Sequence, residues 1–282
     1  MERHGFAFGD AYVRVNVTEP SVARAPLPTL YFLHGRFSDS TTWNPVIAKL
    51  PQYRCVSLDF PGFGHSFSMR ERGFGVAEHV RLLGEVLKRV PASRSVLVGH
   101  DFGGGVAAML AAQSPEKVAG LILLNSASPC EPLGAQVGWL GWTARWEVLR
   151  ELRISKPRSL EVEALLLEPW YKGSTRKALV RALRALEQTW PEFHERQYWR
   201  QSLTRSERAA LILWGGRDTI QSLERGIALS RVLPNSDFYV DPDSGHWPGL
   251  DNSSWVGARI REFMFRLGVE ESAISDRKSL SR

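Results

Sequence analysis

The stretch SVLVGHDFGGGVAAMLAA, residues 95–112, holds an apolar run, a glycine-flanked turn and an apolar helical pattern in direct succession. The run Val96–Val98 predicts a short buried strand, and the alanine-rich residues after the last glycine predict a helix. Between them, Gly99 and Gly103 flank Asp101 at a sharp turn, which requires residues without bulk on both sides. The stretch therefore predicts strand, turn and helix, with the Asp101 side chain lifted at the carboxyl end of the strand.

Strand-like apolar runs alternate with helical patterns on both sides of this stretch. Such alternation predicts an α/β fold, in which a parallel sheet is covered by helices on both faces. Residues 6–17 alternate loosely and predict edge strands, and residues 255–267 have the apolar spacing of a closing helix. The other predicted strands lie at residues 29–33, 54–58, 96–98, 121–124, 210–214 and 237–240.

A different pattern occupies the segment 129–208. Trp, Leu, Arg, Glu and Ala recur there at helical spacing, interrupted by prolines, and the pattern contains no strand-like run. We therefore expect a helical cap at 129–208, inserted between the two parts of one core at 1–128 and 209–268. The polar residues 269–282 are expected to form a flexible tail.

Length, composition and cysteine count indicate which broad class of protein this chain belongs to. The 282 residues, of which 43% are hydrophobic, suffice for one sizeable core. Cys55 and Cys130 are too few for a disulfide framework and are expected to be reduced thiols of a cytoplasmic protein. The amino terminus lacks the apolar region of a secretory signal, and no run approaches the ~20 apolar residues that span a bilayer. We therefore expect no membrane partner.

The net charge is +6. An excess of positive charge can attract nucleic acid, but the cationic residues are dispersed and no groove-reading motif accompanies them. We therefore expect a small-molecule substrate and no nucleic-acid partner. The sequence leaves the oligomeric state open.

Three polar residues each follow a predicted strand, and their order along the chain is informative about the site. Asp101 follows the strand at 96–98, Asp218 follows the strand at 210–214, and His246 follows the last strand. Open α/β sheets bind their ligands at the carboxyl ends of strands, so these side chains are expected to meet at one site. Glu131, which follows the strand at 121–124, is the alternative to Asp218 as the acidic partner of His246.

On these residues the chain resembles the α/β-hydrolase superfamily over nearly its whole length. The resemblance implies a mostly parallel eight-stranded sheet with helices on both faces and a helical cap insertion. The motifs that carry it are His34-Gly35, Asp59-x-Pro61-Gly62-x-Gly64-x-Ser66, Gly99-His100-Asp101-Phe102-Gly103-Gly104, Gly215-x-x-Asp218 and Ser244-Gly245-His246-Trp247-Pro248.

Asp101 stands where most members of that superfamily carry serine. In this respect the chain resembles epoxide hydrolases and haloalkane dehalogenases. Both families use an aspartate nucleophile. The resemblance implies an alkyl ester on Asp101, hydrolysed by water with His246 as general base and Asp218 orienting it. The backbone N–H of Phe102, with one from Arg36 or Phe37, would form the oxyanion hole. No metal and no organic cofactor is implied.

The alternative reactions differ in the group that leaves the substrate carbon. Opening an epoxide requires a proton donor. The resemblance implies that two cap tyrosines, Tyr171 and Tyr198, supply it. Alternatively, both rings only pack inside the cap. Haloalkane dehalogenases bind halide through N–H groups, but here Phe102 and Arg36 replace the Trp and Asn of that family. Epoxide hydrolysis is therefore our first hypothesis and halide removal the second. A non-catalytic ligand-binding member and an unusual chemistry on an aromatic substrate are the further alternatives.

Arg36 itself has two interpretations from the sequence. It either binds an anionic group of the substrate within the site or is turned to solvent.

Overall fold

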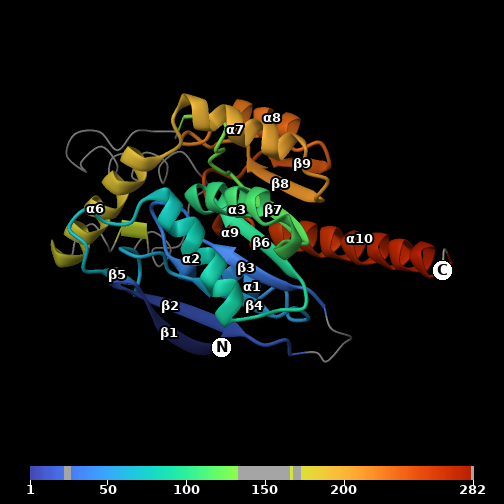
Figure 1. The fold of residues 1–282 in the computed structure, drawn as a ribbon, viewed down its shortest axis with the longest axis horizontal. Helices are drawn as coiled ribbons and strands as arrows, with labels where there is room; N and C mark the ends of the chain where they lie inside the picture. Colours follow the sequence, from blue (N-terminus) through green and yellow to red (C-terminus); the bar gives the residue numbers. More distant parts are fainter. Residues whose placement is uncertain (22–26, 133–165, 168–172, 281–282) are drawn as a thin grey trace.

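The computed structural model describes residues 1–21, 27–132, 166–167 and 173–280. Its strands form one sheet in the order β1-β2-β4-β3-β6-β7-β8-β9, with β5 added beside β2 (Figure 1). The strands are β1 (Glu2–Phe8), β2 (Ala11–Thr18), β3 (Thr29–Leu33), β4 (Cys55–Leu58), β5 (Phe67–Ser68), β6 (Ser95–His100), β7 (Gly120–Leu124), β8 (Ala210–Gly215) and β9 (Ser236–Asp241).

The sheet is mostly parallel, as predicted. All pairs from β4 to β9 are parallel, and β2 joins β1, β4 and β5 in antiparallel pairs. The eight strands of the main path match the expectation, and the two-residue β5 is an addition. From β3 the chain continues to β4 on one side, while β6 pairs with the other side. The strand order reverses here, and the carboxyl ends of strands at such a reversal are where open α/β sheets bind their ligands.

One face of the sheet is covered by α2 (Val76–Arg89), α3 (Phe102–Gln113) and α8 (Leu223–Val232). In Figure 1, α2 and α3 are seen in front of the strands, and α8 is seen above β8 and β9. The helix α3 is almost wholly buried, because it lies between the sheet, α2 and the helices that follow β7. Its small residues Gly, Ala and Val allow this close approach.

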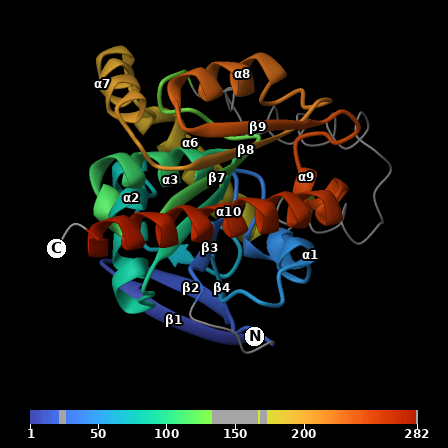
Figure 2. The same cartoon turned by 90° about the vertical axis from the view of Figure 1, so that its right-hand side faces the viewer.

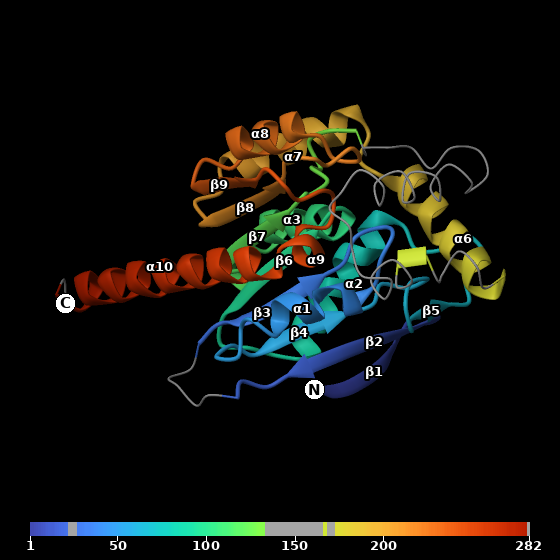
Figure 3. The same ribbon diagram turned by 180° about the vertical axis from the view of Figure 1, so that it is seen from behind.

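The opposite face is covered by α1 (Asn44–Ile47) and α10 (Ser253–Leu280), which Figures 2 and 3 show crossing the strands. The apolar spacing of the closing helix is confirmed, because its predicted inward residues are all buried in one core cluster. These residues are Val256, Ile260, Phe263, Met264 and Leu267. Short helical turns η1 (Ser40–Trp43), η2 (Pro115–Lys117) and α9 (Pro248–Asp251) connect the main elements.

Helices α6 (Gly173–Thr189) and α7 (Phe193–Thr204) lie between β7 and β8, within the segment expected to form the cap. The cap contacts the core through close approaches. A Cβ at Gly62, where φ is +97°, would lie 2.7 Å from Cβ of Ala182 on α6. At the end of α6, Thr189 Oγ1 accepts a 2.9 Å hydrogen bond from the backbone of Val76. Residues 133–165 and 168–172 lie outside the described part of the chain.

The carboxyl terminus differs from the expectation of a flexible tail at 269–282. Helix α10 continues from Ser253 to Leu280 without a break at Gly268 (Figure 1). The residues beyond Gly268 include Glu, Ala, Arg and Lys, which have high helix propensity, and no proline follows. A helix already nucleated on the core extends at little cost, which accounts for the helical form of this segment, and its flexibility stays a prediction.

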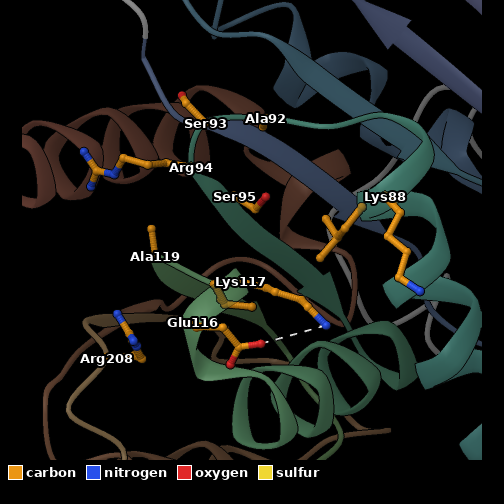
Figure 4. A pocket seen from close by; sticks show the side chains of 11 residues that line it. Lys88, Ala92, Ser93, Arg94, Ser95, Glu116, Lys117, Ala119 and Arg208 are labelled. Carbon is orange, nitrogen blue, oxygen red and sulfur yellow. Dashed lines mark ion pairs between the residues drawn. The ribbon is translucent and has the colours of Figure 1, made fainter.

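A cavity of about 470 Å³ opens at the end of the sheet opposite Asp101, where β6 and β7 begin. Four cationic residues, Lys88, Arg94, Lys117 and Arg208, line it together with Glu116, whose ion pair with Lys117 is drawn in Figure 4.

Over the part of the chain described here, no helix combines the length and apolarity that crossing a bilayer demands.

Candidate active site

Asp101 occupies the predicted sharp turn between β6 and α3. Its φ of +46° and ψ of −121° place a residue with a side chain in a strained region, at a cost of about 1–3 kcal/mol. The surrounding backbone holds it there, because the Asp101 carbonyl accepts hydrogen bonds from Gly104 and Ala127 at 3.1 and 2.9 Å. A Cβ at Gly103 would lie 2.5 Å from the carbonyl oxygen of Leu33, so this turn excludes bulk there. The strand, turn and helix predicted for residues 95–112 are confirmed.

The Asp101 carboxylate is bound by the side chain of Arg36. Nε of Arg36 lies 2.9 Å from Oδ2 and Nη2 lies 3.0 Å from Oδ1, so the ion pair is bidentate. Both side chains are buried, at 1% and 0% exposure. Arg36 is therefore not turned to solvent, and its guanidinium binds the expected nucleophile of the protein itself.

This ion pair controls the ionisation of Asp101. Burial acts to raise the pKa of the carboxyl, but the charge and hydrogen bonds of Arg36 outweigh burial and hold it far below its usual range. Asp101 is consequently a carboxylate throughout the physiological pH range. Its charge is compensated locally, because the guanidinium bonds to both oxygens.

The predicted oxyanion hole is partly occupied by Asp101 itself. The backbone N–H of Arg36 donates to Asp101 Oδ2 at 3.1 Å. The rings of Phe102 and Phe37 are both buried, and the Arg36 guanidinium lies over the Phe37 ring, 5.2 Å from its centroid. The roles expected for the backbone N–H groups of Phe102 and Phe37 stay predictions.

His246 and Asp218 meet as their order along the chain predicts. Nδ1 of His246 lies 2.8 Å from Asp218 Oδ2, and both side chains are buried. The other carboxylate oxygen, Oδ1, accepts from the backbone N–H groups of Ile220 and Gln221 at 2.7 and 2.8 Å. These bonds fix the orientation of the carboxylate, which in turn fixes the imidazole ring. Glu131, the alternative acid, instead pairs with Arg200 at 3.1 Å.

Asn125 is a site residue that the sequence analysis missed. Its Nδ2 donates to Asp218 Oδ2 at 2.5 Å, and its Oδ1 accepts from the backbone of Gly215 at 2.9 Å. Asn125 follows β7 with a φ of +39°, a conformation that asparagine tolerates better than most residues. Its position directly after a buried strand was the available signal, because that is the edge where Asp101 and Asp218 also lie.

Gln221 is a second missed residue. It is fully buried, and its Nε2 donates to Asp101 Oδ1 at 3.0 Å. Counted over the described residues, Gln221 and Arg36 together donate four hydrogen bonds to the Asp101 carboxylate. A glutamine three positions after an acid is unremarkable in a sequence, so no pattern singled it out.

His100 supports the loop that carries His246. Its Nε2 lies 2.7 Å from the carbonyl oxygen of His246, and the two rings are 4.7 Å apart. Because an uncharged imidazole is favoured by burial, the pKa of His100 is lowered to about 4.

Of the two cap tyrosines expected to activate the substrate, the structure describes one. Tyr198 on α7 is 57% exposed, and its ring packs edge-on against Trp199 at 5.1 Å. Tyr171 lies outside the described residues. Their role therefore stays a prediction, and the exposure of Tyr198 gives it no support.

A carboxyl group of the cap instead lies within the electrostatic range of Arg36. Glu187 on α6 is half-buried. Burial raises its pKa, while the positive charge of Arg36 opposes that shift. Three positions further on, the ring centroid of Trp190 lies 6.1 Å from that of Phe102. The carboxyl end of α6 therefore lies beside the sharp turn at Asp101.

Known proteins agree with this architecture. A family model described as the alpha/beta hydrolase fold matches residues 28–253. The uncharacterized hydrolase YugF of Bacillus subtilis (strain 168) is 26% identical over 252 residues, covering 84% of this chain and 89% of that protein. A 2-hydroxymuconate semialdehyde hydrolase of Pseudomonas sp. (strain CF600) is 26% identical over 259 residues, covering 83% and 86% respectively.

A solved structure of a bacterial membrane phospholipase A shares the fold, with a TM-score of 0.77 and 19% identity over 94% of this chain and 86% of that one. The match of the family model spans most of the chain, from before β3 to the start of α10. The protein therefore belongs to the α/β hydrolase family.

Proposed function

We propose that the protein is a hydrolase that acts through an alkyl ester on Asp101. The observation that carries this proposal is the placement of the Asp101 carboxylate on the strained turn, with Oδ2 on the backbone N–H of Arg36. In an ester formed at Oδ1, Oδ2 is the carbonyl oxygen. The same N–H would therefore stabilise the oxyanion when the ester is hydrolysed.

In the first step, Oδ1 of Asp101 attacks a saturated carbon of the substrate. A carbon–oxygen bond forms to Asp101, and the bond between that carbon and the leaving group breaks. A carboxylate needs no general base for this attack, which suits a group whose pKa is held far below its usual range. Nη2 of Arg36 and Nε2 of Gln221 must release Oδ1, while Nε and the backbone N–H of Arg36 can keep Oδ2.

In the second step, water attacks Cγ of the ester and gives a proton to His246. Asp218 stabilises the imidazolium that results, as the 2.8 Å contact to Nδ1 allows. Negative charge develops on Oδ2, where each donor of Arg36 contributes roughly 3–4 kcal/mol by analogy with other oxyanion holes. The tetrahedral centre then collapses by breaking the bond between Cγ and Oδ1, so Oδ1 leaves as the oxygen of the product and takes the proton from His246.

Epoxide hydrolysis to a diol is the reaction we propose first. The epoxide oxygen needs a proton as the ring opens, and we propose Tyr171, Tyr198 and Glu187 of the cap segment as candidate donors. Glu187 has the support of its partial burial and raised pKa, which favour a protonated carboxyl. Removal of halide from an alkyl halide is the second reaction, because halide leaves without a proton.

A non-catalytic ligand-binding role is favoured by one observation. The Asp101 carboxylate receives four hydrogen bonds and has no exposed surface, so a ligand must displace donors before it reaches Oδ1. A protein that only binds ligands could keep this ion pair permanently closed.

A single turnover in ¹⁸O-water separates these functions. Styrene oxide and 1-bromobutane serve as probes, and the Asp101 peptide is weighed after the reaction. The ester route predicts ¹⁸O in the Asp101 carboxylate of the native protein and no turnover in Asp101→Asn at early times. The exposed Asp243→Asn serves as the matched control and is expected to behave as the native protein. Absence of label and of turnover with both probes would favour the binding role.

We also propose a reducing compartment, such as the cytoplasm, and a small molecule as the partner. Cys55 and Cys130 are both free and buried, which suits a protein that does not rely on disulfides. The buried site between the sheet and the cap supports a substrate of limited size.

A further inference from the structure

Gln221 is held more rigidly than its place in a loop suggests. Its backbone N–H donates to Asp218 Oδ1 at 2.8 Å, and its carbonyl accepts from Nε1 of the buried Trp214 at 3.0 Å. Its side chain then reaches Asp101 Oδ1 at 3.0 Å. One residue thus connects the loop of the triad acid with the carboxylate expected to act as nucleophile.

The amide of Gln221 leaves one strong acceptor unused. Its Oε1 is buried and has no hydrogen-bond partner among the residues that the structure describes. A carboxylate accepts hydrogen bonds and cannot donate them, so Nε2 must face Asp101 and Oε1 must face elsewhere. A buried acceptor without a partner costs about 1–3 kcal/mol, which points to a donor that arrives with the reaction.

We propose that Gln221 positions the hydrolytic water by accepting a hydrogen bond from it at Oε1. This inference rests on the proposed ester mechanism. Water has two hydrogens and must attack Cγ of Asp101, while His246 accepts only one of them. A second acceptor on the amide beside Oδ1 would restrict the water to the orientation that directs its lone pair at Cγ.

The step balances without any further reactant. The water oxygen bonds to Cγ, and the bond between Cγ and Oδ1 breaks. Oδ1 leaves on the substrate carbon as the product oxygen and takes the proton that the water gave to His246. The other proton stays on the new carboxyl group, hydrogen-bonded to Gln221 Oε1. It leaves to solvent when the carboxylate re-forms its ion pair with Arg36.

The test measures the two chemical steps separately. In Gln221→Met the volume of the side chain is nearly kept, and both polar atoms are lost. Rapid quenching and mass spectrometry with styrene oxide and 1-bromobutane follow the esterified Asp101 peptide. We expect ester formation within about threefold of the native rate and ester hydrolysis 10- to 100-fold slower, so that the ester accumulates. Gln201→Met, an exposed glutamine on α7, is the matched control and should accumulate none beyond the native level.

The outcomes distinguish this inference from the ester mechanism itself. His246→Gln removes the general base and should trap the ester whatever Gln221 does. If that variant traps ester but Gln221→Met hydrolyses it at the native rate, the water-positioning role is wrong and the ester mechanism stands. A variant that slows both steps equally would indicate a merely structural role for Gln221 and would overturn the inference. If no variant forms ester with either probe, both proposals are overturned.

Discussion

Arg36 and Asp101 form a buried bidentate ion pair between the loops that follow the carboxyl ends of β3 and β6. The two strands pair in parallel with Leu33 opposite Gly99. Arg36 lies three residues beyond Leu33, and Asp101 lies two residues beyond Gly99, so the register of the sheet brings them together. The expected nucleophile is therefore stored as an ion pair, and any reaction at Oδ1 begins with a change in this contact.

Removing Arg36 should destabilise the fold. Arg36→Met leaves the Asp101 carboxylate buried without its cation, and we expect the free energy of unfolding to fall by about 3–5 kcal/mol. The double variant Arg36→Met/Asp101→Asn should recover part of this loss, because the uncompensated charge is gone. Urea denaturation of the four proteins in the cycle measures the coupling. Additive losses from the two single variants would show that the ion pair is not coupled.

The exposed pair of Arg217 and Asp243 provides the control for that cycle. These residues are 2.7 Å apart, and each is about half exposed. Solvent screens such a pair, so the equivalent cycle should give a coupling of only ~0–1 kcal/mol.

Asn125 should support the Asp218 carboxylate through its side chain. Asn125→Gly keeps a residue that tolerates the φ of +39° and removes the hydrogen bonds to Asp218 and from Gly215. We expect a loss of about 1–3 kcal/mol in the free energy of unfolding, because one bond involves a charged group. Asn125→Ala should lose about 1–2 kcal/mol more, since alanine is strained at positive φ. Equal stabilities of the two variants in thermal unfolding would contradict a strain contribution.

Acid should destabilise the protein through His79 and His100. Burial lowers the pKa of each to about 4 in the folded protein, against an ordinary value of 6.5. Between these values the unfolded chain binds protons that the folded protein does not, so stability present above pH 6.5 is lost as the pH falls towards 4. The loss is roughly 3 kcal/mol for each histidine.

Substitution of His79 should flatten that pH dependence. His79 packs against Phe60, Phe74 and Phe102, so His79→Phe keeps an aromatic ring in the same environment. Denaturation midpoints measured from pH 7 to pH 4 should change less than in the native protein. The exposed His4→Gln should retain the native slope, and the same slope in His79→Phe would rule out its contribution.

Glu187 should distinguish the two proposed leaving groups. Glu187→Gln removes a carboxyl that burial keeps more protonated than usual, and we expect the opening of styrene oxide to slow at least tenfold. Turnover of 1-bromobutane should be unchanged, because halide requires no proton. Rapid-quench measurement of ester formation with both probes checks this, with the exposed Glu207→Gln as control. Equal slowing of both probes would exclude a proton-donor role.

Local patterns in the chain were sufficient for much of the fold. The glycines around Asp101, the alternation of apolar runs with helices, and the inward residues of α10 are short-range features, and the structure confirms each of them. The extension of α10 to Leu280 was not predictable from polarity, because a helix nucleated on the core is extended at little further cost.

The partners of the site residues required the tertiary structure. Asn125 and Gln221 follow a strand and an acid in ways that many loop residues do, and only the assembled loops show that they bind Asp218 and Asp101. The exposure of Tyr198 likewise depends on how α7 lies on the core.

The strand, turn and helix around Asp101 could be predicted from the amino-acid sequence, because apolar spacing and glycine act over a few residues. The order of Asp101, Asp218 and His246 along the chain was likewise visible in the sequence. The ion pair between Arg36 and Asp101 could be identified only in the folded chain. The two lie 65 positions apart and meet solely because β3 and β6 pair in one register at the point where the strand order reverses.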